Sequence, residues 1–246
     1  MIRFEGKVAI VTGGGSGIGA ATARRLASEG AAVVVADVDL GHAEAVAREI
    51  VAARRKAIAA AADVSKEADV VALVDRATCA FGALDVMVNN AGIGGVQGDI
   101  DEVPLEVWQQ VIGVNLTGVF LGLKHAVRAM KAGGRKGAIV NVASILGHVG
   151  FAHAAAYTAS KHGVIGLTQA AALELGPLGI RVVTVDPAFI RTPMIAGMED
   201  GVIPLHPIGR LGMPEEVAAF IAFLASDEAT FLTGASYLVD GGYVAR

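Results

Sequence analysis

Cysteine is almost absent from this chain, and runs of one charge are missing as well. A single cysteine, Cys79, occurs among 246 residues, so no internal disulfide can form, which fits a reducing compartment. Cys79 lies in an apolar stretch of helical spacing with no motif around it, and we expect it in the core rather than as a nucleophile. The net charge is −4, and the densest basic cluster, Arg54-Arg55-Lys56, is typical of a solvated turn. The sequence therefore gives no indication of a nucleic-acid partner.

Signals for membranes and metals are equally sparse. The longest late apolar run, Val217–Ala225, is far shorter than the ~20 residues that a spanning helix needs. The N-terminus reaches a strand-like segment within a few residues, without the charged and apolar regions of a signal peptide. The histidines show no metal-ligand spacing, since even His148 and His153 do not share one helical face. We expect a cytoplasmic protein with no membrane partner and no metal.

Hydrophobic residues make up 54% of the chain and charged residues only 18%. This balance fits a parallel sheet that helices cover on both faces. Apolar, β-branched runs alternate with stretches of helical spacing, an order that favours an α/β fold with right-handed crossovers. No linker or repeat divides residues 1–246, so we expect a single doubly wound Rossmann-type domain. The expected strands are Val8–Val11, Ala32–Ala36, Ala57–Ala61, Leu84–Val88, Ala138–Val142, Arg181–Val185 and Ser236–Val239, and the expected helices are Ala20–Ser28, Ala43–Val51, Ala68–Phe81 and Pro214–Ala225, with longer ones at about Leu105–Met130 and Ala154–Leu175.

A glycine-rich turn, Thr12–Gly19, follows the first expected strand and opens the first helix. Glycine permits positive φ and the close approach of a pyrophosphate, and the N-terminus of the helix offers it free N–H groups. Two spacings are open: G-x-x-x-G-x-G, which begins at Gly13, and G-x-G-x-x-A, the common dinucleotide pattern, which begins at Gly15. In either spacing the turn predicts a dinucleotide site.

Asp37 ends the second expected strand, eighteen residues past Gly19. A carboxylate at this place accepts hydrogen bonds from the hydroxyls of the adenosine ribose and repels a 2′-phosphate. The next residues, Val38 and Asp39, and Ser16 in the glycine turn provide no cation that would hold such a phosphate. The sequence therefore favours NAD over NADP.

Tyr157 and Lys161 are four residues apart, which places them on one face of a helix. A phenol ordinarily titrates near pH ~10, and a neighbouring ammonium favours the phenolate and lowers that pKa. Ser144 stands thirteen residues before Tyr157. A proton donor and acceptor of this kind, together with a dinucleotide, indicates an enzyme that moves hydride onto a carbonyl.

Over essentially its whole length the sequence resembles the short-chain dehydrogenase/reductase family. The motifs occur in the order and spacing of the family, and together they are highly specific. One departure is Ala188, where many members have glycine after the proline. The matching motifs are Thr12–Gly19, Asp63-Val64 after the third strand, Asn89-Asn90-Ala91-Gly92 after the fourth, Asn115, Ser144, the Tyr157/Lys161 pair, Pro187 to Thr192 after the sixth strand, and Asp240-Gly241-Gly242.

The resemblance implies a seven-stranded doubly wound sheet, a nicotinamide cofactor and a role for each motif residue. Tyr157 would donate or accept the substrate proton, and Ser144 would hydrogen-bond the substrate oxygen. Lys161 would bind the nicotinamide ribose and lower the pKa of the tyrosine, and Asn115 would help to hold a water in a proton relay. The cofactor contacts would be Gly13, Ser16, Gly17, Ile18 and Gly19 at the phosphates, Asp37 at the ribose, Asp63 and Val64 at adenine, Asn90 beside a ribose, Ile190 and Thr192 at the nicotinamide carboxamide, and also Ala91, Gly92, Pro187, Tyr157 and Lys161.

The segment from Thr192 to Gly212 has no clear period. It follows the sixth strand, at the edge where open α/β sheets bind ligands. Its apolar side chains either line a pocket for a small, apolar or cyclic substrate or only pack the segment against the body. Three loop histidines could approach such a substrate, although isolated loop histidines are more often bystanders. The apolar residues are Met194, Ile195, Met198, Ile203 and Leu205, and the histidines are His148, His153 and His206.

The helix that carries Tyr157 is apolar or small on nearly every face, and a helix of this kind is buried. In the family that the sequence resembles, the equivalent helix packs against its copy in another subunit. We therefore expect a homotetramer.

Three functional hypotheses follow. The first is an NAD-dependent oxidoreductase that interconverts a small, apolar or cyclic ketone and its secondary alcohol. The second is a 3-oxoacyl-carrier-protein reductase, but such enzymes usually prefer NADPH, which Asp37 opposes, and Leu173 stands where a basic residue would meet the acidic carrier. The third is an NAD-binding sensor or scaffold, a class that typically lacks the tyrosine, serine or lysine that this chain retains.

Overall fold

The computed structural model describes residues 2–245, which contain a seven-stranded sheet. The strands are β1 (Val8–Thr12), β2 (Ala32–Asp37), β3 (Ala57–Ala61), β4 (Val86–Asn89), β5 (Gly137–Val142), β6 (Ile180–Pro187) and β7 (Ser236–Val239). They lie in the order β3-β2-β1-β4-β5-β6-β7, and every neighbouring pair is parallel. The doubly wound fold that the sequence predicts is confirmed.

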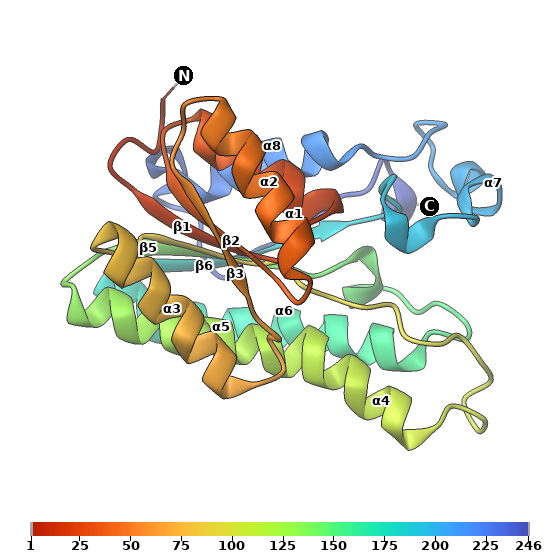
Figure 1. The fold of residues 1–246 in the computed structure, drawn as a ribbon. Coiled ribbons are helices and arrows are strands. Elements are labelled where there is room, and N and C mark those ends of the chain that lie inside the picture. The colour runs from red at the N-terminus through yellow and green to blue at the C-terminus, as the bar shows by residue number, and fades with distance from the viewer. Residues whose placement is uncertain (1, 246) are drawn as a thin grey trace.

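Helices cover both faces of this sheet (Figure 1). They are α1 (Gly17–Ser28), α2 (Leu40–Ala52), α3 (Glu67–Phe81), α4 (Leu105–Ile112), α5 (Gly118–Ala132), α6 (Ala155–Leu175), α7 (Glu199–Val202) and α8 (Pro214–Ala225). One layer holds α1, α2 and α8, and the other holds α3, α4, α5 and α6. No helix among the described residues is long and apolar enough to cross a bilayer.

The strand order creates a crevice at the centre of the sheet. β1 and β4 are neighbours, yet the chain first moves outward through β2 and β3 and only then returns to β4 and continues to β7. Open α/β sheets bind ligands at such a reversal, outside the carboxyl ends of the strands. The segments after Thr12 and Asn89 therefore border the expected site.

Predicted strands differ from the observed bounds by two residues at most, and predicted helices by three at most. The helix predicted over about Leu105–Met130 contains a wider turn, because Gly113–Thr117 between α4 and α5 is π-helical. A π-helical turn adds a residue to a helix and is frequent at functional sites. Hydrophobic spacing does not reveal such a turn, since the chain stays helical on both sides of it.

Cys79 is exposed, so the prediction that it belongs to the core is wrong. α3 turns one stripe towards the sheet, formed by Val70, Leu73, Val74 and Ala77. A helix turns about 100° per residue, so Cys79, two positions after Ala77, faces away from the stripe. The exposure of Cys79 is therefore determined by its position on the helix and not by the average apolar character of the segment.

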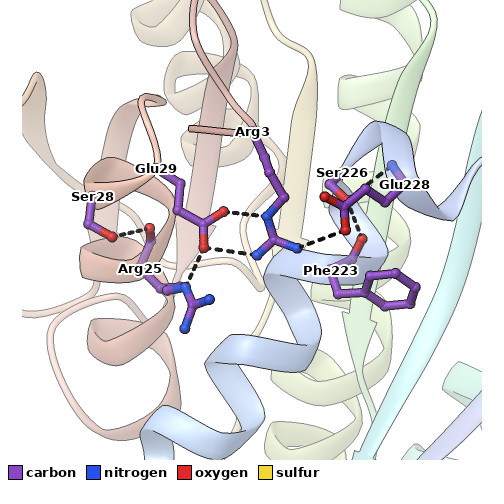
Figure 2. A network of polar contacts seen from close by, with 7 residues as sticks. All are labelled: Arg3, Arg25, Ser28, Glu29, Phe223, Ser226 and Glu228. Atoms are coloured by element: carbon purple, nitrogen blue, oxygen red, sulfur yellow. Dashed lines mark hydrogen bonds and ion pairs between the residues drawn. The ribbon is translucent and has the colours of Figure 1, made fainter. Parts of the chain in front are cut away.

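An ion-pair network joins the N-terminal segment to the end of α1 and to the turn after α8 (Figure 2). Arg3 donates to both carboxylate oxygens of Glu29, at 2.6 Å from Nε and 2.8 Å from Nη2. It also pairs with Glu228 at 3.7 Å, and Arg25 donates to Glu29 from the last turn of α1. Burial acts to raise the pKa of Glu29, but the hydrogen bonds from Arg3 and Arg25 outweigh it and leave that pKa below its ordinary value.

We expect Glu29→Gln to lower the free energy of unfolding by about 1–3 kcal/mol at neutral pH, because Arg3 loses its anionic partner. A carboxylate with a depressed pKa stabilises the fold above its unfolded-state pKa, and this contribution is lost as pH falls through the folded-state pKa. Denaturant titrations at several pH values should therefore show the difference shrinking below about pH 4. Glu44→Gln, which breaks an exposed pair with Arg48, should change stability by less than about 1 kcal/mol. A difference for Glu29→Gln that does not depend on pH would contradict its ionic origin.

Candidate active site

A cavity of about 670 Å³ opens at the carboxyl edge of the sheet. Its wall is built from the segments that follow β1 to β6 and from the start of α6. Parallel strands end at one edge, so residues far apart in the sequence meet there. The predicted site residues in the wall are Gly13, Ser16, Gly17, Ile18, Asp37, Asp63, Val64, Asn90, Ala91, Gly92, Ser144, Tyr157, Lys161, Pro187, Ile190 and Thr192, whereas Gly19 and Asn115 do not line it.

The glycine turn after β1 has the backbone shape that an anion needs. Gly13 and Gly17 have positive φ, at 60° and 50°. A Cβ on Gly19 would lie 2.0 Å from the carbonyl oxygen of Gly13, so only glycine fits there. α1 begins at Gly17 and no side chain caps its first turn, which leaves backbone N–H groups free for a phosphate. A Cβ on Gly15, the first glycine of the other spacing, would lie 2.6 Å from Cβ of His42, so the turn requires glycines from both spacings.

Asn90 holds this turn in place. Its Nδ2 donates to the carbonyl oxygens of Thr12 at 2.9 Å and of Gly13 at 3.1 Å. The backbone N–H groups of Asn90 and Ala91 donate in turn to Oγ1 of Thr12, at 3.0 Å and 3.1 Å. The glycine turn and the segment after β4 therefore form one hydrogen-bonded unit across the crevice, a positioning role that sequence reasoning did not foresee for Asn90.

The carboxylate of Asp37 is fixed at one end of the cavity. Its Oδ2 accepts a hydrogen bond from the N–H of Gly15 at 2.9 Å, and its Oδ1 accepts one from the N–H of Asp39 at 3.1 Å. Arg24 and Arg25 on the nearby helix α1 are engaged in ion pairs with glutamates and do not line the cavity. Both oxygens of Asp37 are thus oriented before any ligand binds.

Asp63 adds a second negative charge near this end. Its Oδ1 accepts hydrogen bonds from the hydroxyl of Ser65 at 2.6 Å and from the backbone of Ser65 at 3.1 Å. The hydroxyl contact is the main reason that the pKa of Asp63 lies below its ordinary value. Within residues 2–245, Lys161 is the one positively charged side chain in the wall. Lys66 pairs with Asp63 at 3.2 Å but does not line the cavity, so the wall near Asp37 and Asp63 provides no cation of its own for a 2′-phosphate.

Ser144, Tyr157 and Lys161 meet in the same cavity. α6 carries Tyr157 and Lys161 one turn apart, and Ser144 follows β5. Nζ of Lys161 donates to the carbonyl oxygen of Val142 at 2.8 Å and lies 5.4 Å from the centroid of the Tyr157 ring. Oγ of Ser144 accepts a hydrogen bond from the N–H of Leu146 at 3.2 Å. A hydroxyl, a phenol and an ammonium are thus brought together at one place.

Burial dominates the protonation of both groups on α6. It lowers the pKa of Lys161 to about 8, and the charge of Asp186 opposes this shift. It raises the pKa of Tyr157, and a hydrogen bond with Ser144 opposes that shift. In the protein alone, loss of hydration disfavours the phenolate more than the hydrogen bond with Ser144 favours it, so the pKa of Tyr157 lies above its ordinary value.

Asn115 lies behind the wall and is fully buried. Its Oδ1 accepts from the N–H of Ile93 at 2.8 Å, and its Nδ2 donates to the carbonyl oxygen of Ile93 at 2.9 Å and to Oγ of Ser160 at 3.2 Å. The side chain therefore ties the π-helical segment to the loop after β4 and to α6. Both amide hydrogens are used in these contacts, so the side chain acts first as a support for the wall.

The wall beside Tyr157 is apolar. Leu146, Phe151 and Phe189 line it, and the rings of Phe151 and Phe189 lie with their centroids 6.1 Å apart. Sequence reasoning missed all three residues. A usable signal was present for two of them, because Leu146 follows Ser144 by two positions and Phe189 lies directly after the end of β6, where ligand-binding loops begin.

The sequence left open whether the apolar side chains of the segment 192–212 line a pocket or pack the segment against the body, and the structure shows both arrangements. Some of its apolar side chains face the cavity, and others pack with Phe189 in a cluster of their own. The first group is Met194, Ile195 and Met198, and the second includes Ile195 again with Ile203 and Leu205.

None of the three loop histidines lines the cavity. His153 pairs with Asp99 at 2.9 Å on the surface, and Nδ1 of the buried His206 lies 2.9 Å from the carbonyl oxygen of Val202. The remaining one, His148, contacts a buried carboxylate. No group of three or more His, Cys, Asp or Glu side chains within the described part of the chain is arranged to hold a metal ion.

Known proteins share both the sequence and the fold. The family model described as enoyl-(acyl carrier protein) reductase matches residues 13–244. The chain is 49% identical over 245 residues to a cyclohexanol dehydrogenase of Acinetobacter sp. (strain SE19), with 99% of this chain and 97% of the relative covered. It is 51% identical over 246 residues to a cis-4-hydroxycyclohexanecarboxylate dehydrogenase of Sinomonas cyclohexanicum, with 98% of each covered.

Solved structures give the same picture. The crystal structure of a 3-ketoacyl-(acyl-carrier-protein) reductase from Brucella melitensis, complexed with NADH, matches with a TM-score of 0.92 and 42% sequence identity. The match covers 97% of this chain and 98% of that chain. At this identity and coverage, the agreement extends over the whole sheet and both helical layers.

We expect Gly19→Ala to weaken dinucleotide binding by at least about tenfold, or about 1.4 kcal/mol. The added Cβ would overlap the carbonyl oxygen of Gly13 at 2.0 Å and Nδ2 of Asn90 at 2.5 Å, so the turn must shift. Fluorescence titration with NADH measures the Kd. Gly176→Ala is the matched control, because nothing lies within 4 Å of its added Cβ. An unchanged Kd for Gly19→Ala would show that this turn does not hold the dinucleotide.

Proposed function

The chain belongs to the short-chain dehydrogenase/reductase family, and from this premise we propose that it interconverts a neutral alicyclic secondary alcohol and its ketone with NAD as the hydride carrier. The observation that carries the proposal is that one cavity combines a dinucleotide turn with Ser144, Tyr157 and Lys161 beside an apolar wall. Relatives with about half of their residues identical are named as dehydrogenases of cyclohexanol and of cis-4-hydroxycyclohexanecarboxylate.

The turn at Gly13 to Gly19 fits the pyrophosphate of a dinucleotide, since its glycines leave room that a Cβ would fill and the first N–H groups of α1 are uncapped. Asn90 keeps the turn in this shape. Asp63, Val64, Ile190 and Thr192 are proposed as further contacts along the cofactor. The nicotinamide ring, when bound, supplies or accepts the hydride.

Two side chains of this protein, Ser144 and Tyr157, act on the oxygen of the substrate in the proposed reaction. Ser144 donates a hydrogen bond to it, and Tyr157 gives it a proton in reduction or takes the proton in oxidation. Two donors aimed at one oxygen stabilise the negative charge that develops there. Lys161 holds the cofactor ribose and stabilises the phenolate. Asn115 supports the wall behind them, where a water would complete the proton relay.

Asp37 supports NAD rather than NADP. The backbone N–H groups of Gly15 and Asp39 orient its carboxylate, which suits it to accept hydrogen bonds from ribose hydroxyls. A 2′-phosphate at that place would meet a negative charge and no cation. NADH is present in the related reductase structure from Brucella melitensis.

A neutral ring suits the cavity better than a carboxylated one. Leu146, Phe151 and Phe189 line the wall beside Tyr157. Lys161 is the one cation in the described part of the wall, and its ammonium is already bonded to a backbone carbonyl. A carboxylate on the substrate would lose hydration there without gaining an ion pair. We infer that unsubstituted or alkyl-substituted cyclohexanols are preferred over hydroxycyclohexanecarboxylates.

A 3-oxoacyl-carrier-protein reductase activity is the second candidate. The related structure that carries this name has NADH bound, so Asp37 does not by itself argue against the hypothesis. The apolar wall argues for a compact ring instead of a long acyl thioester. A sensor or scaffold function is disfavoured, because serine, tyrosine and lysine are all retained and lie in one cavity.

The proposal includes a single catalytic domain over residues 1–246 that assembles as a homotetramer in the cytoplasm. Support for one domain is that strands from residue 8 to residue 239 belong to one sheet. Support for assembly is the exposure of large apolar side chains on the outer helices. These include Leu173 on α6, Leu105 and Trp108 on α4, and Phe120 on α5.

We expect the protein to oxidise cyclohexanol with NAD, and kcat/KM for cyclohexanol to exceed that for cis-4-hydroxycyclohexanecarboxylate at least about tenfold, or about 1.4 kcal/mol. NADH absorbance measures both reactions. Cyclohexanone and acetoacetyl thioester are compared in the reverse direction. Faster reduction of the thioester would favour the carrier-protein hypothesis, and no turnover in the whole panel would favour a sensor.

In the same assay Tyr157→Phe should lower kcat at least about 100-fold, because it removes the proposed acid and base. Its Kd for NADH should change little. Tyr237→Phe is the matched control, since Tyr237 lies on β7 and does not line the cavity. Full turnover by Tyr157→Phe would refute the acid–base role.

We expect Asp37→Asn to improve the Kd for NADP by about tenfold relative to NAD, because the charge that repels the 2′-phosphate is gone. Asparagine keeps an oxygen that can accept from the N–H of Gly15. Titrations with both cofactors measure the selectivity. Asp39→Asn removes a neighbouring exposed charge and retains a good cap for α2, so its selectivity should stay near that of the wild type. Unchanged selectivity in Asp37→Asn would remove the basis for naming NAD.

A further inference from the structure

A fully buried carboxylate, Asp186, takes no part in the reaction as described so far. It lies near the carboxyl end of β6 with 0% of its surface exposed. Its Oδ2 lies 2.7 Å from Nε2 of His148 and accepts a hydrogen bond from the hydroxyl of Ser236. Its Oδ1 has no hydrogen-bond partner among residues 2–245. A buried carboxylate with an unpaired oxygen is costly unless a positive charge lies near it.

The register of the sheet shows where that positive charge is. Val142 in β5 pairs with Val185 in β6, and both side chains belong to the core on the side of α1 and α8. Successive residues of a strand point to opposite faces, so Asp186 faces the layer of α6. On α6, Nζ of Lys161 donates to the carbonyl oxygen of Val142 at 2.8 Å. The buried ammonium and the buried carboxylate therefore lie near the ends of two adjacent strands, on the same face of the sheet, without a direct ion-pair contact between them.

The hydrogen bonds around Asp186 suit an ionised carboxylate, which can only accept. Thr184 donates to Oγ of Ser236 at 2.9 Å, which leaves the hydroxyl hydrogen of Ser236 for Asp186. His148 places Nε2 against the same oxygen, and its own side chain is 28% exposed. Both neighbours thus bind Oδ2 and leave Oδ1 for other contacts.

We propose that Asp186 is the buried counter-ion of Lys161 and a positioning residue for the reaction, because its negative charge keeps Lys161 in the ammonium form. His148 and Ser236 hold the carboxylate in place. The inference rests on the proposed function, because Lys161 takes part in that reaction. The electrostatic interaction between Asp186 and Lys161 does not depend on whether the enzyme turns over.

The electrostatics of the site support this assignment. Burial lowers the pKa of Lys161 to about 8, and Asp186 is the charge that acts against it. None of the other described groups around Lys161 carries a formal charge while the phenol is protonated. These uncharged groups are Tyr157 on α6, Ser144 and the carbonyl of Val142 at the end of β5, the backbone of Gly92 after β4, and Asn115 and Ser160 behind the wall. His148 and Ser236 contact Asp186 instead of Lys161.

The direction of the effect follows from the sign of the charge. A negative charge favours the protonated form of each neighbouring group, whether that form is an ammonium or a phenol. Loss of the charge of Asp186 therefore moves the titration of Lys161 to lower pH. A purely structural role for Asp186 predicts no such shift.

The first test is Asp186→Asn, which removes the charge and preserves the size. NMR of protein labelled with 13C at lysine Cε follows the Lys161 titration, with the resonance assigned by its loss in Lys161→Met. We expect the midpoint to fall by about 1 pH unit or more. Asp85→Asn makes the same change at a buried carboxylate before β4, at the opposite edge of the sheet, and should leave the midpoint in place. An unchanged midpoint in Asp186→Asn, or an equal shift in Asp85→Asn, would overturn the proposal.

The second readout is the pH profile of kcat for alcohol oxidation, in which the limb that reports Lys161 should move to lower pH in Asp186→Asn. A uniform loss of kcat at every pH, with the limbs in place, would overturn the positioning role. If the wild type oxidises no cyclic alcohol, the proposed function fails while the NMR titration still decides the counter-ion.

A double variant covers the case in which Asp186→Asn does not fold. His148→Leu/Asp186→Val replaces both members of the His148–Asp186 hydrogen bond by apolar side chains, so that only the hydroxyl hydrogen of Ser236 loses its acceptor. The Lys161 midpoint should fall in this variant as well. A midpoint at the wild-type position would overturn the proposal.

Discussion

The buried ammonium of Lys161 is the group on which the rest of the site depends. Only 3% of the residue is exposed, and Nζ donates to the carbonyl oxygen of Val142 at 2.8 Å. This contact requires α6 to lie close against the end of β5. Gly147 permits the approach, because a Cβ there would lie 3.0 Å from the carbonyl oxygen of Lys161. Asn141 in β5 donates to Thr168 on α6 at 2.8 Å and anchors the helix further along. The packing of one helix on one strand thus places Tyr157 and Lys161 in the cavity.

The cavity also has two electrically different regions, and this difference gives a bound dinucleotide a direction. Asp37 and Asp63 make one region negative, and Lys161 is the cation of the other. Between them, uncapped N–H groups at the start of α1 favour an anion. Ribose hydroxyls suit the first region, a pyrophosphate suits the uncapped turn, and the reacting ring then lies beside Tyr157. A dinucleotide bound in the reverse direction would place no proton donor near its substrate.

The features that were predictable from the sequence are those that depend on local spacing. The positions of the strands, the glycine turn and the Tyr157/Lys161 pair all follow from short patterns and their order along the chain. Asp186 and His148 escaped prediction, because they are 38 residues apart and meet only through the pairing of β5 with β6. The exposure of Cys79 depends on which stripe of α3 meets the sheet. The pKa of Tyr157 depends on burial, and no spacing rule measures burial.

Burial acts in opposite directions on the two side chains of α6, and this determines the protonation state of the protein alone. It brings the pKa of Lys161 down to about 8 and takes that of Tyr157 above its ordinary value near ~10. Both shifts disfavour a phenolate beside an ammonium in the protein alone. A further positive charge in the cavity favours that pair, and an oxidised nicotinamide carries one. In the reaction that we propose, the oxidised cofactor therefore helps Tyr157 to take a proton from an alcohol, whereas a protonated Tyr157 can give a proton to a ketone without that help.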